Sequence, residues 1–338
     1  MQNENMKTIL FEKQNNTTAF FSFIVKWLSF FVIVCLVLPG CKTLYIHKSQ
    51  AVVHPGYSGM AQINSETYIV VHDAKTCEDG ARLGIIRLRK GNAPKYVQLR
   101  VDDWKHKDGR PNDLESICSL PGQRAEFLAA ESGYWKGKFG RIFHIRVQGI
   151  DAQVLNVYQL PLIADNDEQR EGDNFEGLSC AERDDGKILV ILGERGGSSL
   201  YPTGVLRWGL LDIAKGTLKW INMDKEICAP GNWIDPKSKR DISDLYLDDQ
   251  GMLWSVATQD ASDEGPFRSV IYRIATIQDD LQNPLKIIKN TKASWVVDGF
   301  KIEALSGPTY VVKGCFLTFA TEDESFNGIW RSLYPPIE

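Results

Sequence analysis

The sequence predicts an all-β protein in which five similar units form a five-bladed β-propeller. A large aliphatic side chain recurs at intervals of 57, 61, 67 and 60 residues, each time near the start of a strand-like run. A second strand-like run, carrying one basic residue, follows each of these positions by about thirty residues or slightly less. Helical periodicity is nearly absent beyond the first forty residues. The aliphatic residues are Met60, Ile117, Leu178, Leu245 and Leu305, and the basic ones are Arg87, His144, Arg207, Arg273 and Arg331.

The repeat divides the chain into blades of short strands separated by Gly, Asp, Asn and Pro turns. We expect blades at residues 57–104, 113–159, 174–223 and 241–297, and a fifth from 301 that ends after its third strand at 333. Residues 43–54 have no partner of their own and are expected to supply the missing outer strand of the fifth blade. A six-bladed propeller is the alternative, but the connections at 214–239 and 277–300 are short for a hidden blade.

The N-terminus carries an export signal. Lysines precede an apolar run of about a dozen residues, the length of a signal-peptide core rather than of a membrane span. The run ends in "LPGC", residues 38–41, which resembles the lipobox of bacterial lipoproteins. The resemblance implies a signal peptide at 1–40 and lipid attachment at Cys41. With the repeat, the chain is then expected to continue with a linker and closing strand at 41–56 and a propeller at 57–338. An uncleaved anchor helix at 18–39 is the alternative.

Both alternatives place the propeller outside the cytoplasmic membrane, in the cell envelope. Lys42, which follows the expected lipidated cysteine, resembles the signal for sorting to the outer membrane, with the protein facing the periplasm. The formal net charge of −4 and the absence of a basic stripe give no reason to expect nucleic acid as a partner.

The cysteines do not predict a disulfide framework. Five remain beyond Cys41, and their number is odd and their spacing wide. Neither disulfides nor a Cys-x-x-Cys metal site is therefore expected, and buried free thiols are favoured. These residues are Cys77, Cys118, Cys180, Cys228 and Cys315.

Acidic residues mark one or both of two corners in each predicted hairpin. Antiparallel pairing brings the start of a blade's first strand beside the end of its second strand. Carboxylates at these corners should therefore meet at one mouth of the central channel, with His72 and Arg195 among them. The corner pairs are Ser58 with Asp73, Glu115 with Glu131, Glu176 with Glu194, Ser243 with Asp260, and Glu303 with Glu322.

Clustered carboxylates raise one another's pKa unless a cation or a basic partner is present. Such a ring suits a hard cation, above all calcium, or an acid–base pair or a metal-activated water. The alternative is a purely structural role, in which these carboxylates hold neighbouring blades together by accepting hydrogen bonds from backbone N–H groups. The ligand-binding candidates are Glu115, Glu176, Glu303, Arg195 and His72, and the metal-binding candidates are Asp73, Glu131, Glu194, Asp260 and Glu322.

The segments "DLESI", "NFEGLS" and "KIEALS", with "AESG" and "LGERGG", resemble repeated motifs of phytase-like β-propellers. That group includes the bacterial domains called esterase-like activity of phytase and the calcium-dependent phytases. The resemblance implies a propeller with an acidic channel mouth and calcium. Two departures count against a phytase: those relatives have six blades, and only Arg195 and Lys301 supply positive charge within the motifs.

Together these features predict a lipid-anchored envelope propeller that binds a cation or a small ligand at its acidic mouth. A metal-dependent ester or phosphoester hydrolase is the activity that this arrangement favours. No nucleophile elbow, zinc-protease motif or P-loop occurs in the sequence. A non-catalytic interaction platform in the envelope is the alternative function.

Overall fold

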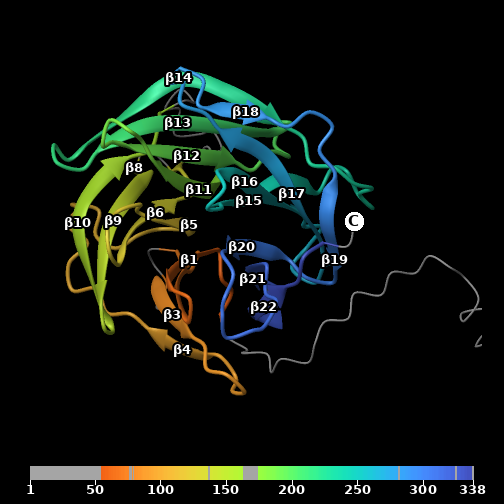
Figure 1. Cartoon of the computed structure of the whole chain (residues 1–338), viewed down its shortest axis with the longest axis horizontal. Coiled ribbons are helices and arrows are strands. Elements are labelled where there is room, and N and C mark those ends of the chain that lie inside the picture. Colours follow the sequence, from red (N-terminus) through yellow and green to blue (C-terminus); the bar gives the residue numbers. More distant parts are fainter. Residues whose placement is uncertain are drawn as a thin grey trace, which may run out of the picture. The chain divides into compact units, whose positions relative to one another are not determined.

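Five antiparallel sheets, one for each sequence repeat, form the predicted five-bladed propeller (Figure 1). The computed structural model describes residues 55–336 apart from 76, 77, 79, 136, 137, 163–173, 281, 324 and 325. All of them belong to one unit, residues 49–338. The signal peptide, Cys41 and the closing strand at 43–54 lie outside the described residues and stay predictions. Across the described part of the chain, no helix has the length and apolar character needed to cross a membrane.

The first three blades each contain four strands, and the first strand of each lies nearest the centre (Figure 1). A small hairpin of β7 (Tyr134–Trp135) and β8 (Lys138–Phe139), which the sequence did not predict, interrupts blade two. Blade one consists of β1 (Gly59–Asn64), β2 (Thr67–Val71), β3 (Leu83–Arg87) and β4 (Lys95–Gln98). Blade two consists of β5 (Leu114–Ser119), β6 (Glu126–Glu131), β9 (Arg141–Gln148) and β10 (Asp151–Gln159). Blade three consists of β11 (Phe175–Glu182), β12 (Ile188–Glu194), β13 (Gly204–Asp212) and β14 (Thr217–Ile227).

The last two blades depart from the four-strand pattern. In blade four, the third strand pairs with two short strands along its outer edge. Blade five has three described strands, as predicted. Blade four consists of β15 (Lys239–Leu247), β16 (Met252–Gln259), β17 (Arg268–Ile277), β18 (Leu285–Ile287) and β19 (Ala293–Asp298), and blade five of β20 (Ile302–Ser306), β21 (Leu317–Thr321) and β22 (Trp330–Leu333).

The six-bladed alternative is wrong. The two connections that were considered as places for another blade, 214–239 and 277–300, contain only outer strands of blades three and four, β14, β18 and β19, together with the start of β15. Each outer strand pairs with the third strand of its own blade. The repeat interval therefore corresponds to one blade throughout the described chain.

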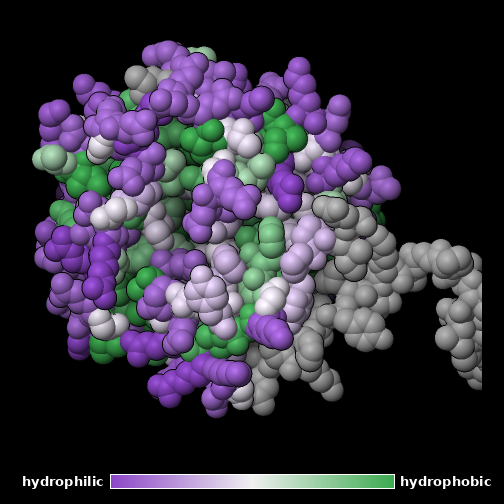
Figure 2. Space-filling view, in the orientation of Figure 1, coloured by the Kyte–Doolittle hydropathy of each residue, from purple (hydrophilic) through white to green (hydrophobic). Residues whose placement is uncertain are grey.

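The repeated aliphatic residues hold neighbouring blades together. Buried apolar side chains form five clusters, and each cluster contains one of these five residues. Leu178 of blade three, for example, belongs to the same cluster as Leu128 and Ile142 of blade two. Because each sheet buries its face against the next sheet, the interval read from the sequence is the interval of blade-on-blade packing. Polar side chains cover most of the rim (Figure 2).

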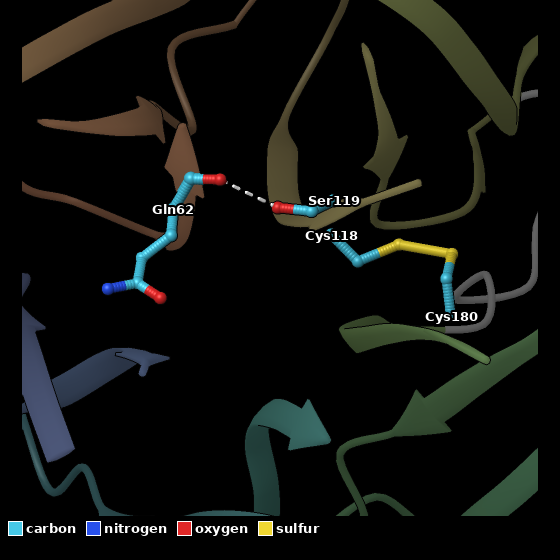
Figure 3. Close-up of a disulfide and its surroundings, with 4 residues drawn as sticks. All are labelled: Gln62, Cys118, Ser119 and Cys180. Carbon is cyan, nitrogen blue, oxygen red and sulfur yellow. Dashed lines mark hydrogen bonds between the residues drawn. A yellow bond between two sulfur atoms is a disulfide. The ribbon is translucent and has the colours of Figure 1, made fainter. Parts of the chain in front are cut away.

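A disulfide joins the first strands of blades two and three, between Cys118 in β5 and Cys180 in β11 (Figure 3). The expectation of free thiols is therefore wrong for these two residues. Their separation of 62 residues is one more than the 61 between Ile117 and Leu178, so the two cysteines lie on opposite faces of their strands. They therefore face each other between blades two and three, with Cα atoms 6.2 Å apart. Cys228 and Cys315 are free, as expected, but Cys228 is exposed rather than buried. Cys77 lies outside the described residues.

We expect reduction of this disulfide to lower the free energy of unfolding by about 2–4 kcal/mol, because the bridge restricts the unfolded chain. Cys118→Ser should have the same effect, and reductant should then change nothing further. Urea unfolding with and without reductant measures both. The matched control is Cys228→Ser, which alters an exposed free thiol. Equal unfolding midpoints for reduced and oxidised wild type would contradict this expectation.

Candidate active site

Three glutamates enter the channel mouth through β-bulges. The pairing between the first and second strands shifts by one residue at Glu115 in blade two, at Glu176 in blade three and at Glu303 in blade five. A bulge leaves one residue without a partner and turns its side chain away from the regular alternation of the strand. The three carboxylates come close enough for the charges of Glu176 and Glu303 to act on Glu115. The same local irregularity in three blades thus builds one acidic site.

Arg240, at the start of β15, is the cation that joins this site across three blades. Its guanidinium nitrogens lie 2.7 Å from Asp260 Oδ2, 3.5 Å from Glu176 Oε1 and 3.9 Å from Glu303 Oε1. Burial opposes the charge of Arg240, but Glu176, Glu303 and Asp260 outweigh it and raise the arginine pKa. Blade four has Ser243 where blades two, three and five have the bulged glutamate. It therefore contributes a cation, rather than a glutamate, to the mouth.

Two further cations, Arg195 and Lys301, pair with carboxylates of the site. Arg195 NH1 donates to Glu176 Oε1 at 2.9 Å, so Glu176 is held from two sides. Lys301 Nζ lies 3.1 Å from Glu303 Oε1 and 3.4 Å from Glu322 Oε2, and its side chain is 4% exposed. Charged partners at hydrogen-bond distance stabilise the ionised form of a carboxylate. Glu176 and Glu303 are thus the two bulged glutamates that each lie beside two cations.

Glu115 differs from the other two bulged glutamates because no described cation forms an ion pair with it. Burial, and to a lesser extent the charges of Glu176, Asp73 and Glu303, raise the pKa of Glu115 to about 8, against a smaller opposing effect of Lys75. The side chain nevertheless keeps partial contact with solvent. A carboxyl group of this kind carries a proton at neutral pH and remains accessible to a ligand.

Asp73 and Glu322 extend the site across blades one and five. Burial and the neighbouring Glu303 raise the pKa of Glu322 well above its usual value, and Lys301 only partly offsets this. The charge of Asp73 acts on both Glu115 and Glu322. Asp73 is half-buried and makes no ion pair with any cation in the described chain. The mouth thus contains two carboxyls with raised pKa values, Glu115 and Glu322, beside carboxyls that pair with cations.

Glu194 lies below the mouth, at the end of β12, and is fully buried. One oxygen accepts the N–H of Gly196 at 2.8 Å, and Oε1 has no hydrogen-bond partner among the described residues. Burial raises the pKa of Glu194 to about 8; the Gly196 N–H and Arg195 oppose this effect, and Glu176 adds to it. Glu194 is therefore a second carboxyl that is protonated at neutral pH, but without access to solvent.

Two of the expected site residues serve other contacts. Glu131 forms a fully buried pair with Arg141, whose guanidinium also donates to the carbonyls of Gly109 and Arg110. This pair fastens the connection between blades one and two. The ring nitrogens of His72 lie 2.7 Å from Gly56 O and 2.9 Å from Tyr96 Oη, within a group of aromatic rings. Neither contact set includes the bulged glutamates.

Arg240 is the site residue that the sequence interpretation missed. The predicted site consists of acids at the strand starts. Arg240 is a base, and it lies one residue before the corresponding motif of blade four. A signal was present, since blade four alone combines a serine at the glutamate position with two basic residues, Lys239 and Arg240, directly before its motif. The expected shortage of positive charge at the mouth is thus partly wrong.

Within the described residues, no group of three or more His, Cys, Asp or Glu side chains is arranged to hold a metal ion. Of the carboxylates expected to bind calcium, Asp260 pairs with Arg240, Glu322 with Lys301 and Glu131 with Arg141. Asp73 and Glu194 form no ion pair with a cation of the described chain. Calcium ligands are oxygens that must face the ion together. No step in the chemistry below depends on a metal, and calcium binding stays a prediction.

No family model and no curated sequence matches the chain. Among solved structures, the chain is similar to a thermostable family-43 glycoside hydrolase, with a TM-score of 0.52, 8% identity, and coverage of 86% of this chain and 92% of that one. It also matches a xylan beta-1,4-xylosidase from Bacillus halodurans C-125, with a TM-score of 0.45, 12% identity, and coverage of 83% of this chain. The chain spans 53% of the length of that xylosidase. At this identity, the likeness to the first structure shows the propeller fold alone, and the phytase-like resemblance stays a prediction.

Glu194→Gln should change the pH dependence of stability. Between pH 4.5, the usual value, and about 8 the unfolded chain loses this proton while the folded protein keeps it, so stability falls with rising pH in that window. Glutamine can still accept the hydrogen bond from the Gly196 N–H. Because its side chain does not titrate, the variant does not lose stability in this pH window. We expect the variant to match wild type at pH 4 and to exceed it by up to about 5 kcal/mol at pH 9.

Chemical denaturation at several pH values measures this difference. Glu226→Gln, an exposed change on β14, is the matched control and should shift stability by the same small amount at every pH. A Glu194→Gln effect that does not vary with pH would contradict the protonated state assigned to Glu194.

Proposed function

We propose that this protein is a hydrolase of the cell envelope that cleaves a glycosidic bond by general acid–base catalysis at the acidic mouth. The observation that carries the proposal is Glu115, a solvent-accessible carboxyl without an ion-pair partner in the described chain, whose pKa is raised to about 8. Enzymes place carboxyls with such raised pKa values where a leaving group must be protonated near neutral pH.

Glu115 is the general acid in this proposal. Its proton passes to the oxygen of the scissile bond as that bond breaks, so the leaving group departs as an alcohol. Glu176 and Glu303 do not take part as bases, because Arg195, Arg240 and Lys301 hold them. Their negative charges serve instead to keep the proton on Glu115.

Asp73 is the proposed base. It is half-buried, carries no ion pair with a described cation, and lies near enough for its charge to act on Glu115. In this role it takes a proton from the attacking water, whose oxygen forms the new bond to the sugar carbon. A pair of carboxyls, one protonated and one ionised, is the minimum that this reaction requires.

The glycosidic bond is preferred over other bonds for two reasons. The site's paired carboxyls match the requirement of glycoside hydrolysis, and the fold is similar to that of a thermostable family-43 glycoside hydrolase. Arg195 and Arg240 are both about one quarter exposed and provide donors for hydroxyl or carboxylate oxygens of a substrate. Esters and phosphoesters, the substrates that the sequence favoured, are the competing class and are tested in the same assay.

Attachment to the membrane through Cys41 is part of the proposal and is supported by the lipobox-like segment at residues 38–41. An anchored hydrolase acts on material within reach of the envelope surface. A calcium ion remains a proposed additional ligand of the carboxylates, which the assay tests by comparing chelator with added calcium.

Glu115→Gln should lower kcat/KM by about 10²–10⁴-fold, because glutamine cannot donate the proton. The loss should be largest for alkyl glycosides and smaller for 4-nitrophenyl glycosides, whose leaving group needs less protonation. In wild type, activity should fall as the pH rises through about 8, where Glu115 loses its proton. This decline should be absent from the residual activity of the variant.

The assay covers a panel of aryl and alkyl glycosides, carboxylate esters and phosphate esters. Glu226→Gln, on the exposed outer strand β14, is the matched control and should leave rates unchanged. Turnover of esters alone would replace glycosides by esters as the substrate class. No turnover of any substrate by wild type would refute the hydrolase and favour an interaction platform.

Cys41→Ser should prevent lipid attachment when the full chain is produced in a bacterial host. Wild type should incorporate labelled palmitate and sediment with the membranes, whereas the variant should do neither. Labelling and fractionation measure the two effects, and Cys35→Ser, within the expected signal peptide, is the control. Palmitate incorporation by Cys41→Ser would rule out Cys41 as the attachment site.

A further inference from the structure

A second cavity lies at the opposite end of the central channel from the bulged glutamates. It has a volume of about 600 Å³ and is lined by residues from all five blades. The bulged glutamates occur at the starts of first strands, whereas this cavity is bounded by later parts of the same strands, among them Gln62, Ser119, Glu182 and Ser306. Its volume falls within the range of cavities that hold small organic ligands.

Two largely buried serines in the cavity wall have hydroxyl groups without a hydrogen-bond partner among the described residues. Ser179 is 3% exposed and Ser306 is 2% exposed, and both line the cavity. Neither hydroxyl makes a hydrogen bond to any described residue, although their neighbours in the wall do. Ser119 Oγ, for example, donates to Gln62 O at 2.9 Å (Figure 3). Buried polar groups without a protein partner normally bind water or a ligand.

The charges of the wall are all negative. Glu182, Asp248 and Asp249 line the cavity, and its lining contains neither lysine nor arginine. Asp248 is fixed by the N–H groups of Gln250 and Met252 and by the Trp254 indole. Glu182 and Asp249 are exposed, and no described cation pairs with either of them. This composition contrasts with the other mouth, where three cations balance the carboxylates.

The remainder of the wall is apolar. Met60, Ile117, Leu245 and Leu305, four of the five repeated aliphatic residues, contribute to it, and the disulfide joining Cys118 to Cys180 closes one side (Figure 3). An apolar body would be desolvated against these side chains. The wall therefore offers apolar contact, free hydroxyls and unbalanced negative charge in one space.

We propose that this cavity binds a small organic cation, an ammonium or guanidinium group carried on an apolar body. The cationic group is attracted by Glu182 and Asp249 and donates to Ser179 or Ser306, while the apolar body contacts the aliphatic and disulfide wall. The site is separate from the proposed hydrolytic mouth, and it stands whether or not that activity is found.

A charge series with a constant apolar body tests the proposal on the folded protein. The probes are phenethylammonium, 2-phenylethanol and 3-phenylpropionate, with binding measured by ligand-observed NMR and calorimetry. We expect the ammonium to bind, the alcohol to bind several-fold more weakly, and the carboxylate not to bind. The E182Q/D249N double variant should weaken ammonium binding about fivefold, and added salt should weaken it in wild type.

Two more variants locate the binding. Ser306→Leu fills the cavity and should abolish ammonium binding. If Ser306→Leu does not fold, E182Q/D249N tests the proposal independently. Glu115→Gln, at the other mouth, should leave ammonium binding unchanged. Equal binding of the three probes, no binding of the ammonium, or an unchanged affinity in E182Q/D249N would overturn the proposal, as would loss of binding in Glu115→Gln.

Discussion

The ionic contact between Arg240 and the carboxylates of three blades is the interaction on which the candidate active site depends. A single guanidinium lies beside Glu176 of blade three, Asp260 of its own blade and Glu303 of blade five. Together with Arg195 and Lys301, it places positive charge beside Glu176 and Glu303 in a partly desolvated space. Their charges then act on Glu115, the one bulged glutamate without a described cationic partner, and favour its protonated form. The acidic mouth is therefore not a uniform ring, because its cations pair with Glu176, Asp260 and Glu303 and leave Glu115 without an ion-pair partner in the described chain.

The propeller makes this arrangement available through its first strands. These strands pack the blades together through the repeated aliphatic residues, and three of them carry a bulged glutamate near the start. The later parts of the same strands form the second cavity, whose chemistry is different. One set of five strands thus holds the fold together and builds two chemically distinct ends of the channel. The disulfide between β5 and β11 reinforces this inner ring at the end opposite to the glutamates.

Much of the fold, but less of the site, could be predicted from the sequence. The blade count followed from the spacing of one repeated aliphatic residue, because each copy packs in a cluster between neighbouring blades. These residues are Met60, Ile117, Leu178, Leu245 and Leu305. Corner carboxylates were predictable, but their partners were not. Glu131 and Glu115 belong to one hairpin, yet Arg141 pairs with Glu131, whereas Glu115 has no ion-pair partner in the described chain. Arg240 and the pairing of Cys118 with Cys180 were missed because both depend on contacts between blades, which the spacing of a single motif does not contain.

The protonation state of Glu115 is the central claim, and infrared difference spectroscopy tests it most directly. Subtracting the spectrum of Glu115→Gln from that of wild type isolates the C=O stretch of this one carboxyl among the several that carry protons. The account predicts a protonated-carboxyl band at pH 7 that is lost as the pH rises through about 8. A difference spectrum that shows only a carboxylate at pH 6 would contradict it, because Glu115 would then be ionised despite the surrounding charges.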